Sequence, residues 1–366
     1  MSPARLPLAI LIPARNEAAR LASALESVLN QPAAEIWVIN DDSHDATPDL
    51  VRQFQARDSR VHLLTLSGSD PGWTGKNRAL RAGALATAQP WLLLLDADVV
   101  LLPGCLETVW RRLGGDQPAP RFEALSLSPE QILGSWAERL FQPAIFAELE
   151  LAFPIARVNS PDDPCAAANG QFICIRRELY LEIGATQPAW RRQVLEDVAL
   201  AVWLKQTRRR YAFYSGQGLA RARMYTGLRS LWRGWRKNLY ALLPARRMLL
   251  AAGAGLFVLA GIGLALARHA GLALAAGAAA AGLWLHLLSA WPHAAGADHM
   301  LTEPTPAMPS RLRRGVGLFL IPWLYFTSAW QMRVRRRVSW KGRTLPATAP
   351  PAQNWEKIGM EHLPGE

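Results

Sequence analysis

The chain has 366 residues, enough for more than one domain, and a formal net charge of +12. Its three cysteines are too few and too irregularly spaced for a disulfide framework or a zinc site, so we expect a reducing compartment. No acidic residue lies between residues 198 and 297, and basic residues crowd the first half of that stretch. The pattern favours anionic lipid headgroups and diphosphates as partners and disfavours nucleic acid.

The N-terminal part alternates short apolar runs with amphipathic stretches. This alternation predicts strands at residues 8–13, 36–39, 61–66 and 91–95, and helices at 17–30, 47–57 and 76–88. It is typical of an α/β fold, a parallel sheet with helices on both faces. Ligands of such sheets bind beyond the carboxyl ends of the strands, and several polar clusters of the chain fall at those ends.

Asp96 and Asp98 follow the strand predicted at 91–95. Two carboxylates one residue apart suit a hard divalent cation, Mg²⁺ or Mn²⁺, which takes oxygen ligands and binds substrate phosphates. The alternative is a turn that caps a following helix. The first interpretation predicts chemistry with a phosphate leaving group.

Two earlier clusters favour a nucleotide. Asp41, at a strand end, can accept a hydrogen bond from a uracil ring nitrogen or a ribose hydroxyl, although such residues also fill turns. Pro13 and Ala14 would offer backbone groups to the base, with Glu17 nearby. Lys76 stands at a glycine-containing helix start that lacks the Walker spacing, and we expect it to contact the nucleotide; the alternative is a solvated lysine.

Glu196 and Asp197 precede an apolar helical stretch. Such a pair is often only a helix N-terminus. Together with Asp96 and Asp98, however, it provides a carboxylate that can remove the acceptor's proton in a single-displacement transfer. We predict Asp197 as the base, with Glu196 raising its pKa by like-charge repulsion.

The C-terminal part carries apolar stretches at residues 248–267, 270–291 and 315–332. The first two are long enough for a transmembrane hairpin, with a buried helical pair as the alternative. The third either spans or is re-entrant. Arg246 and Arg247 precede the first stretch, and residues 6–12 are too short for a signal peptide. We therefore expect a multi-pass protein of the cell (inner) membrane with a cytoplasmic catalytic domain.

Four regions follow from this pattern. They are a cytosolic catalytic domain at 1–225, a basic interfacial segment at 226–247, a transmembrane region at 248–332 and a basic cytosolic tail at 333–366.

The polar clusters, taken in order, resemble glycosyltransferase family 2 over roughly residues 5 to 245. The matching motifs are Ile12-Pro13-Ala14-Arg15-Asn16-Glu17, Asn40-Asp41-Asp42-Ser43, Gly75-Lys76-Asn77-Arg78-Ala79-Leu80, Asp96-Ala97-Asp98 and Glu196-Asp197. The resemblance implies the GT-A nucleotide-diphospho-sugar fold, inversion at the anomeric carbon and a divalent metal. It would assign Asp41 to uridine, Asp96 to ribose or metal, Asp98 to the metal and Asp197 to the base.

The segments at 169–177 and 223–238 are similar to members that glycosylate membrane lipids, among them carotenoid- and hopene-associated glycosyltransferases. That similarity implies acceptor contacts at Gln171, Trp232, Arg233 and Trp235. We therefore predict transfer of a sugar from a nucleotide-diphosphate donor, UDP-linked, to a lipid hydroxyl or carboxylate at a membrane with anionic lipids. The alternatives are a polysaccharide-extending synthase and a membrane-bound nucleotide-sugar-binding protein without catalysis.

Overall fold

The computed structural model describes residues 5–243, 322, 324–330, 337–340 and 343–346. The N-terminal part consists of β1 (Leu6–Ala14), α1 (Ala18–Leu29), β2 (Ala33–Asp41), α2 (Thr47–Arg57), β3 (Val61–Leu66), α3 (Gly75–Ala86) and β4 (Trp91–Leu95). Each strand and helix predicted there is present, and no predicted end moves by more than three residues, the largest shift being the start of β2 at residue 33 in place of 36.

The chain continues through elements that the sequence pattern did not predict, apart from the helical stretch that follows Glu196 and Asp197. They are β5 (Val99–Leu101), α4 (Cys105–Leu113), β6 (Ala124–Ser128), β7 (Glu130–Gln131), α5 (Trp136–Ala152), α6 (Ile155–Val158), β8 (Phe172–Arg176), α7 (Arg177–Thr186), η1 (Trp190–Arg192), α8 (Glu196–Gln206), β9 (Tyr211–Ser215), β10 (Ala220–Ala222), α9 (Leu228–Leu242), β11 (Arg337–Trp340) and β12 (Arg343–Pro346).

The main sheet has seven strands in the order β3-β2-β1-β4-β8-β6-β9. β1 to β4 are parallel, as predicted, but β8 runs antiparallel to both β4 and β6, so the whole sheet is mixed. A backbone hydrogen bond marks the point of reversal. The backbone N–H of Asp96, just past β4, donates to the carbonyl of Gln171, just before β8, so the chain enters β8 at the carboxyl end of β4 and runs back along it.

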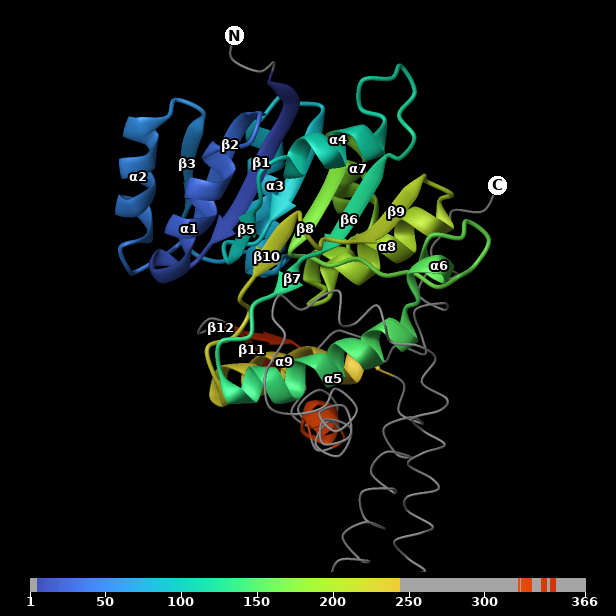
Figure 1. Cartoon of the computed structure of the whole chain (residues 1–366). Coiled ribbons are helices and arrows are strands. Elements are labelled where there is room, and N and C mark those ends of the chain that lie inside the picture. The colour runs from blue at the N-terminus through green and yellow to red at the C-terminus, as the bar shows by residue number, and fades with distance from the viewer. Residues whose placement is uncertain (1–4, 244–321, 323, 331–336, 341–342, 347–366) are drawn as a thin grey trace, which may run out of the picture.

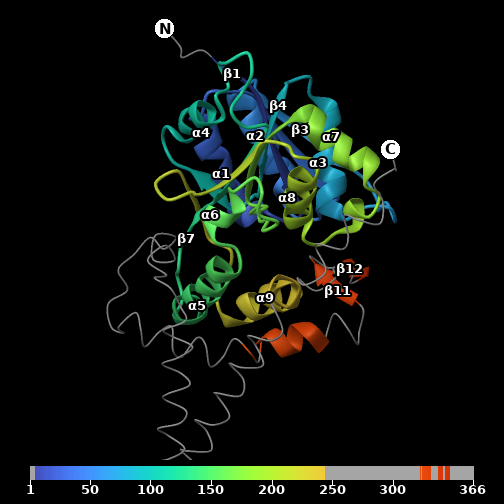
Figure 2. The same ribbon diagram turned by 90° about the vertical axis from the view of Figure 1, so that its right-hand side faces the viewer.

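Helices cover both faces of this sheet (Figure 2). Apolar side chains of α1, α2 and α4 pack on one face, and those of α3, α7 and α8 pack on the other. Short strands β5, β10 and β7 form a second sheet beside the first. The described part of the domain is therefore an α/β sandwich of three layers, in agreement with the predicted fold class.

A layer of helices lies beyond the carboxyl end of β1 (Figure 1). It consists of α5, α9 and the helical residues 324–330, which share a hydrophobic cluster of their own. The rings of Phe146 in α5 and Trp235 in α9 meet edge to face, 6.0 Å between centroids. α5 begins with a capping box, because Ser135 Oγ accepts from the N–H of Glu138 and Ser135 Oγ donates to the Glu138 carboxylate. The layer thus contains α5, which lies inside the range 1–225 that we predicted for the catalytic domain.

Within the residues that the structure describes, no helix combines the length and the apolar composition that a membrane crossing requires. The stretches predicted to span, 248–267 and 270–291, lie outside the described residues, as does most of 315–332.

The contacts of Arg60 should contribute measurably to the free energy of unfolding of the α/β domain. Its guanidinium donates to the carbonyls of Leu29, Gln31 and Ala33 and pairs with Asp58 at 2.7 Å. Arg60→Ala leaves these groups unsatisfied and should cost about 2 kcal/mol, which lowers the melting temperature by roughly 4–8 °C. Arg52→Ala, which breaks an exposed ion pair with Asp49, is the control and should change the melting temperature by less than roughly 2 °C.

Candidate active site

One end of the candidate site is built where β1 and β2 end side by side. Asp41 is 3% exposed and lies between two guanidinium groups. Arg15 Nη1 donates to the Asp41 carbonyl at 2.8 Å and lies 3.9 Å from its carboxylate, and Arg78 Nη1 lies 3.6 Å from the other carboxylate oxygen. Arg78 also donates to the carbonyls of Ser67 and Gly68. The two arginines therefore fix the carboxylate that we predicted for the nucleotide.

Pro13, Ala14 and Glu17, which we also predicted near the nucleotide, lie at or just after the end of β1. Pro13 and Ala14 are the last residues of β1, in register with Ile39 and Asn40 of β2. The N–H of Glu17 donates to Thr47 Oγ1, which ties the start of α1 to the start of α2. Backbone groups of β1 and the side chain of Asp41 thus share one sheet end.

Lys76 is at the centre of the other end of the site. Its ammonium lies 2.8 Å from Asp96 Oδ1 and 2.9 Å from Glu196 Oε1, and it donates to the carbonyl of Gly170 at 3.1 Å. The two carboxylates raise the pKa of Lys76 well above its usual value despite burial. Lys76 therefore joins the acid after β4 to the acid that opens α8, and its contact with the nucleotide stays a prediction.

Asp197 is held by the same small network. Its Oδ2 accepts the N–H of Gly170 at 2.7 Å and its Oδ1 accepts the N–H of Val198 at 2.9 Å. A Cβ on Gly170 would lie 3.0 Å from Asp197 Oδ2 and 3.1 Å from Lys76 Nζ, so a side chain there would push the two groups apart. The backbone N–H of Gly170 thus helps to set the position of the predicted base.

Burial, and then the neighbouring Glu196 carboxylate, raise the pKa of Asp197 to about 6, while Lys76 opposes the shift. The like-charge effect predicted for Glu196 is present but smaller than that of burial. A carboxylate with a pKa in this range is a stronger base than an ordinary aspartate and is still ionised at neutral pH.

Asp98 lies next to this network without being part of it. Burial, then the Asp96 charge, raise the pKa of Asp98 to about 7, and the nearest described cation is Arg20, 3.8 Å away. No group of three or more His, Cys, Asp or Glu side chains in the described residues is arranged to hold a metal. A Mg²⁺ or Mn²⁺ ion needs only one or two carboxylates when a diphosphate and water complete its shell, so the carboxylate oxygens of Asp96 and Asp98 fit such an ion.

Tyr225 and Lys237 both respond to the charges of the site carboxylates. The pKa of Tyr225 is raised by burial and by the charge of Asp98, which places the phenol near that carboxylate. The Tyr225 ring lies against Gly234 of α9, where an added Cβ would come within 2.3 Å of it. Lys237, one turn further, has its pKa lowered by burial, against the opposing effect of Glu196. α9 therefore passes close to the carboxylates.

The residues predicted on the acceptor side lie in different environments. Gln171 is buried and its side chain accepts from Gln131 Nε2 at 3.2 Å, while its backbone carbonyl accepts from Asp96. Trp235 is 3% exposed and packs against Phe146 and Tyr225. Trp232 and Arg233 line a groove on α9. Their contact with an acceptor stays a prediction.

Sequence reasoning did not single out Gly170, Arg15, Arg78 or Tyr225. Arg15 and Arg78 stand inside the motifs that carried the family resemblance and could have been proposed from them. Gly170 and Tyr225 stand inside the segments 169–177 and 223–238 that resembled lipid-glycosylating members, but their contacts with residues far away in the sequence could not be read from those segments.

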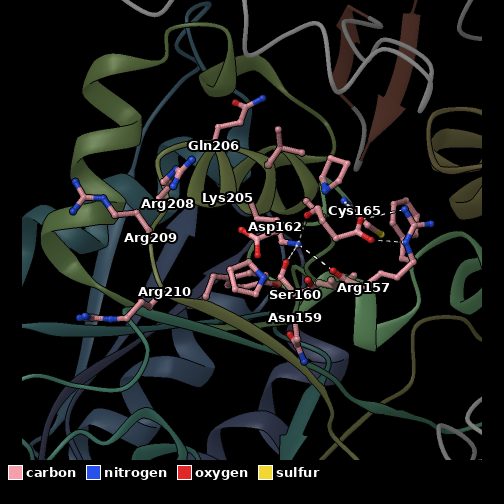
Figure 3. A pocket seen from close by; sticks show the side chains of 18 of the residues that line it. Arg157, Asn159, Ser160, Asp162, Cys165, Lys205, Gln206, Arg208, Arg209 and Arg210 are labelled. Atoms are coloured by element: carbon pink, nitrogen blue, oxygen red, sulfur yellow. Dashed lines mark hydrogen bonds and ion pairs between the residues drawn. The ribbon is translucent and has the colours of Figure 1, made fainter.

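A separate cavity of about 1050 Å³ lies between α6, the loop at 159–166 and the end of α8 (Figure 3). Its basic side chains are largely engaged: Arg157 pairs with Asp163, and Lys205 donates to the carbonyls of Arg157, Ser160 and Asp163. The hydroxyl of Tyr211, in the cavity wall, donates to the carbonyl of Ala167. Residues that line the cavity thus hold the loop at 159–167, which leads to Gly170.

Comparison with known proteins agrees with this geometry. Residues 9–120, which carry β1 to α4 with Asp41, Lys76, Asp96 and Asp98, match the family model "Glycosyl transferase family 2". This part of the chain is therefore similar to glycosyl transferase family 2. The family 2 segment therefore contains the nucleotide end of the site and the first two acids, and Glu196 and Asp197 lie beyond it.

The chain is also similar to curated proteins named 4,4'-diaponeurosporenoate glycosyltransferase. The relative from Staphylococcus haemolyticus is 25% identical over 235 residues, and that from Staphylococcus aureus strain USA300 is 29% identical over 239 residues. Each alignment covers 63% of this chain and 60% of the relative. The chain thus matches less than two thirds of the length of these relatives.

The chain is also similar to solved structures. One is a mannosyltransferase from Pyrobaculum calidifontis in complex with GDP-Man and Mn²⁺, which is 16% identical in sequence to this chain, with a TM-score of 0.49. That match covers 90% of this chain and 88% of the other. A Staphylococcus aureus TarS fragment, residues 1–349, is 14% identical, with a TM-score of 0.41 over 92% of this chain and 95% of that one.

Lys76→Met should test the central ion network. It leaves Asp96 and Glu196 without their counterion and should lower the melting temperature at pH 8 by roughly 4–8 °C, the effect of about 2 kcal/mol. The deficit relative to the wild type should shrink between pH 8 and pH 5, because the uncompensated carboxylates take up protons as the pH falls. A deficit that does not change with pH would show that Lys76 acts through packing alone.

Proposed function

We propose that the chain is an inverting, metal-dependent glycosyltransferase that moves a sugar from a nucleotide-diphosphate donor, a UDP-sugar, to a lipid acceptor at the membrane surface. The observation that carries the proposal is the pair of acids joined through Lys76. Lys76 contacts Asp96, which with Asp98 lies in the segment that matches the family model. The same ammonium contacts Glu196, the neighbour of Asp197 along the chain.

The two sides have separate tasks in this proposal. Asp41, Arg15 and the end of β1 bind the nucleoside, and Asp98 with Asp96 would hold Mg²⁺ or Mn²⁺. The ion, when bound, neutralises the leaving diphosphate. Asp197 accepts the proton of the acceptor hydroxyl while that oxygen forms its bond to the anomeric carbon and the bond from this carbon to the diphosphate breaks. Attack opposite the leaving group inverts the configuration.

The acceptor is proposed from two sources. The relatives are named for transfer to diaponeurosporenoate, an anion. In this chain, α9 is rich in basic and aromatic residues and passes close to the acids. We propose a polyprenoid, carotenoid or hopanoid lipid, presented from an anionic bilayer to a catalytic domain on the cytoplasmic side of the cell membrane. With a carboxylate acceptor, the proton transfer to Asp197 would be unnecessary at neutral pH.

The direct test is release of nucleoside diphosphate by the full chain in lipid nanodiscs, with UDP-sugars and Mg²⁺ or Mn²⁺, with and without a polyprenoid lipid extract. Release that needs both the lipid and the metal supports the proposal. A water-soluble polymer product would support a polysaccharide synthase instead. Donor binding without turnover over a broad acceptor panel would support a binding protein.

The pH profile should report the base. With a hydroxyl acceptor, the turnover number should fall as the pH drops through about 6, because protonation of Asp197 removes the base. Asp197→Asn should lower the turnover number by roughly 10²- to 10⁴-fold and leave donor affinity nearly unchanged. A variant with wild-type turnover would exclude Asp197 as the base.

Asp98→Asn should separate metal use from folding. The exchange removes a charge that is already costly to bury, so the melting temperature should stay level or rise, while turnover should drop on the order of 100-fold. Chelation should produce the same loss in the wild type. Asp49→Asn, on exposed α2, is the matched control and should keep full turnover.

A further inference from the structure

The solvent-facing side of α9 carries three arginines without partners. Arg229, Arg233 and Arg236 are spaced so that they lie within one side of the helix, opposite the buried Leu231 and Trp235. In the described residues none of the three guanidinium groups has an ion pair or a hydrogen bond, and Arg236 Nε is buried with no acceptor. α9 itself contains no acidic residue.

This is unlike arginines of the α/β domain. Arg57 pairs with Glu26 at 2.6 Å, Arg60 with Asp58 at 2.7 Å and Arg157 with Asp163 at 2.8 Å. A buried donor such as Arg236 Nε costs free energy unless it has an acceptor. The three α9 arginines therefore lack the anions that Arg57, Arg60 and Arg157 have found within the chain.

The same arginines surround an apolar groove of about 550 Å³. Its lining consists of Phe141, Leu228, Arg229, Trp232, Arg233 and Arg236. The lining thus combines apolar side chains with three guanidinium groups. A ligand that fills this groove needs a hydrocarbon part and, at one end, an anion that arginine can bind through paired hydrogen bonds.

Large apolar side chains are exposed on the same helical layer. Trp136, the first residue of α5, is 67% exposed and Leu228, the first residue of α9, is 42% exposed. Phe326 and Trp330, in the short helix that packs under α9 in Figure 2, are 40% and 61% exposed. Exposed tryptophans beside arginines are typical of a surface at the headgroup level of a bilayer.

We propose that the groove on α9 is a binding site for one anionic phospholipid, with its phosphate on Arg229, Arg233 and Arg236 and part of an acyl chain over Phe141 and Trp232. The lipid is a resident of the membrane and not the acceptor. The site depends on the membrane location proposed above but not on the sugar-transfer chemistry. It lies on the layer that closes the active site through Tyr225 and α9.

The test measures lipid binding to the full chain in non-ionic detergent, by native mass spectrometry and by thermal shift. Phosphatidylglycerol should bind and raise the melting temperature, and phosphatidylcholine should not. The variant R229Q/R233Q/R236Q should bind phosphatidylglycerol roughly 10- to 100-fold more weakly, because each arginine near an anionic headgroup adds to the attraction. Its melting temperature without lipid should equal the wild-type value, since the arginines have no partner to lose.

A matched control removes the same charge elsewhere. R111Q/R112Q/R121Q changes three exposed arginines on and just after α4, away from α9 in Figure 1, and should bind phosphatidylglycerol like the wild type. Equal binding of the two phospholipids, or unchanged binding by the α9 variant, overturns the proposal. Competitive displacement of phosphatidylglycerol by a polyprenoid acid that is then glycosylated also overturns it, since the groove would then belong to the acceptor. Absence of sugar transfer in every variant would contradict the proposed function and leave the lipid result standing.

Discussion

The active site depends on one ammonium group. Lys76 contacts Asp96, Glu196 and the carbonyl of Gly170, and the N–H of Gly170 holds Asp197. Four acids crowded at the end of one sheet would repel one another, and without an internal cation their burial would be unfavourable. Lys76, at the start of α3, offsets part of this repulsion and also donates to the carbonyl of Gly170, the residue whose N–H holds Asp197.

The arrangement separates two chemical environments within a short distance. Asp96 is paired with Lys76 at 2.8 Å, whereas Asp98 has, among the described residues, only Arg20 at 3.8 Å and a pKa raised to about 7. Asp197 has two backbone donors and a lower pKa, about 6. Carboxylates of the same kind are thus prepared for different tasks by burial and by neighbours.

The N-terminal fold could be predicted because its signals are local. Apolar runs such as Trp91–Leu95 and amphipathic stretches such as Thr47–Arg57 contain the information for their own structure, and the acids at the strand ends follow from them. The reversal of β8, the contact of Gly170 with Asp197 and the placement of Tyr225 beside Asp98 depend on tertiary packing. The segments 169–177 and 223–238 carried a family resemblance, but a resemblance does not give these contacts.

The chain leaves the α/β domain after β7, forms α5 in the helical layer and returns through α6. The two layers are therefore interlaced and not consecutive along the sequence. A fragment cut after residue 225 would retain α5 but lose α9, leaving Phe141, Ile145 and Phe146 without the helix that shares their cluster. Such a fragment would expose a continuous apolar surface and aggregate, so a soluble catalytic domain cannot be obtained simply by removing the C-terminal part.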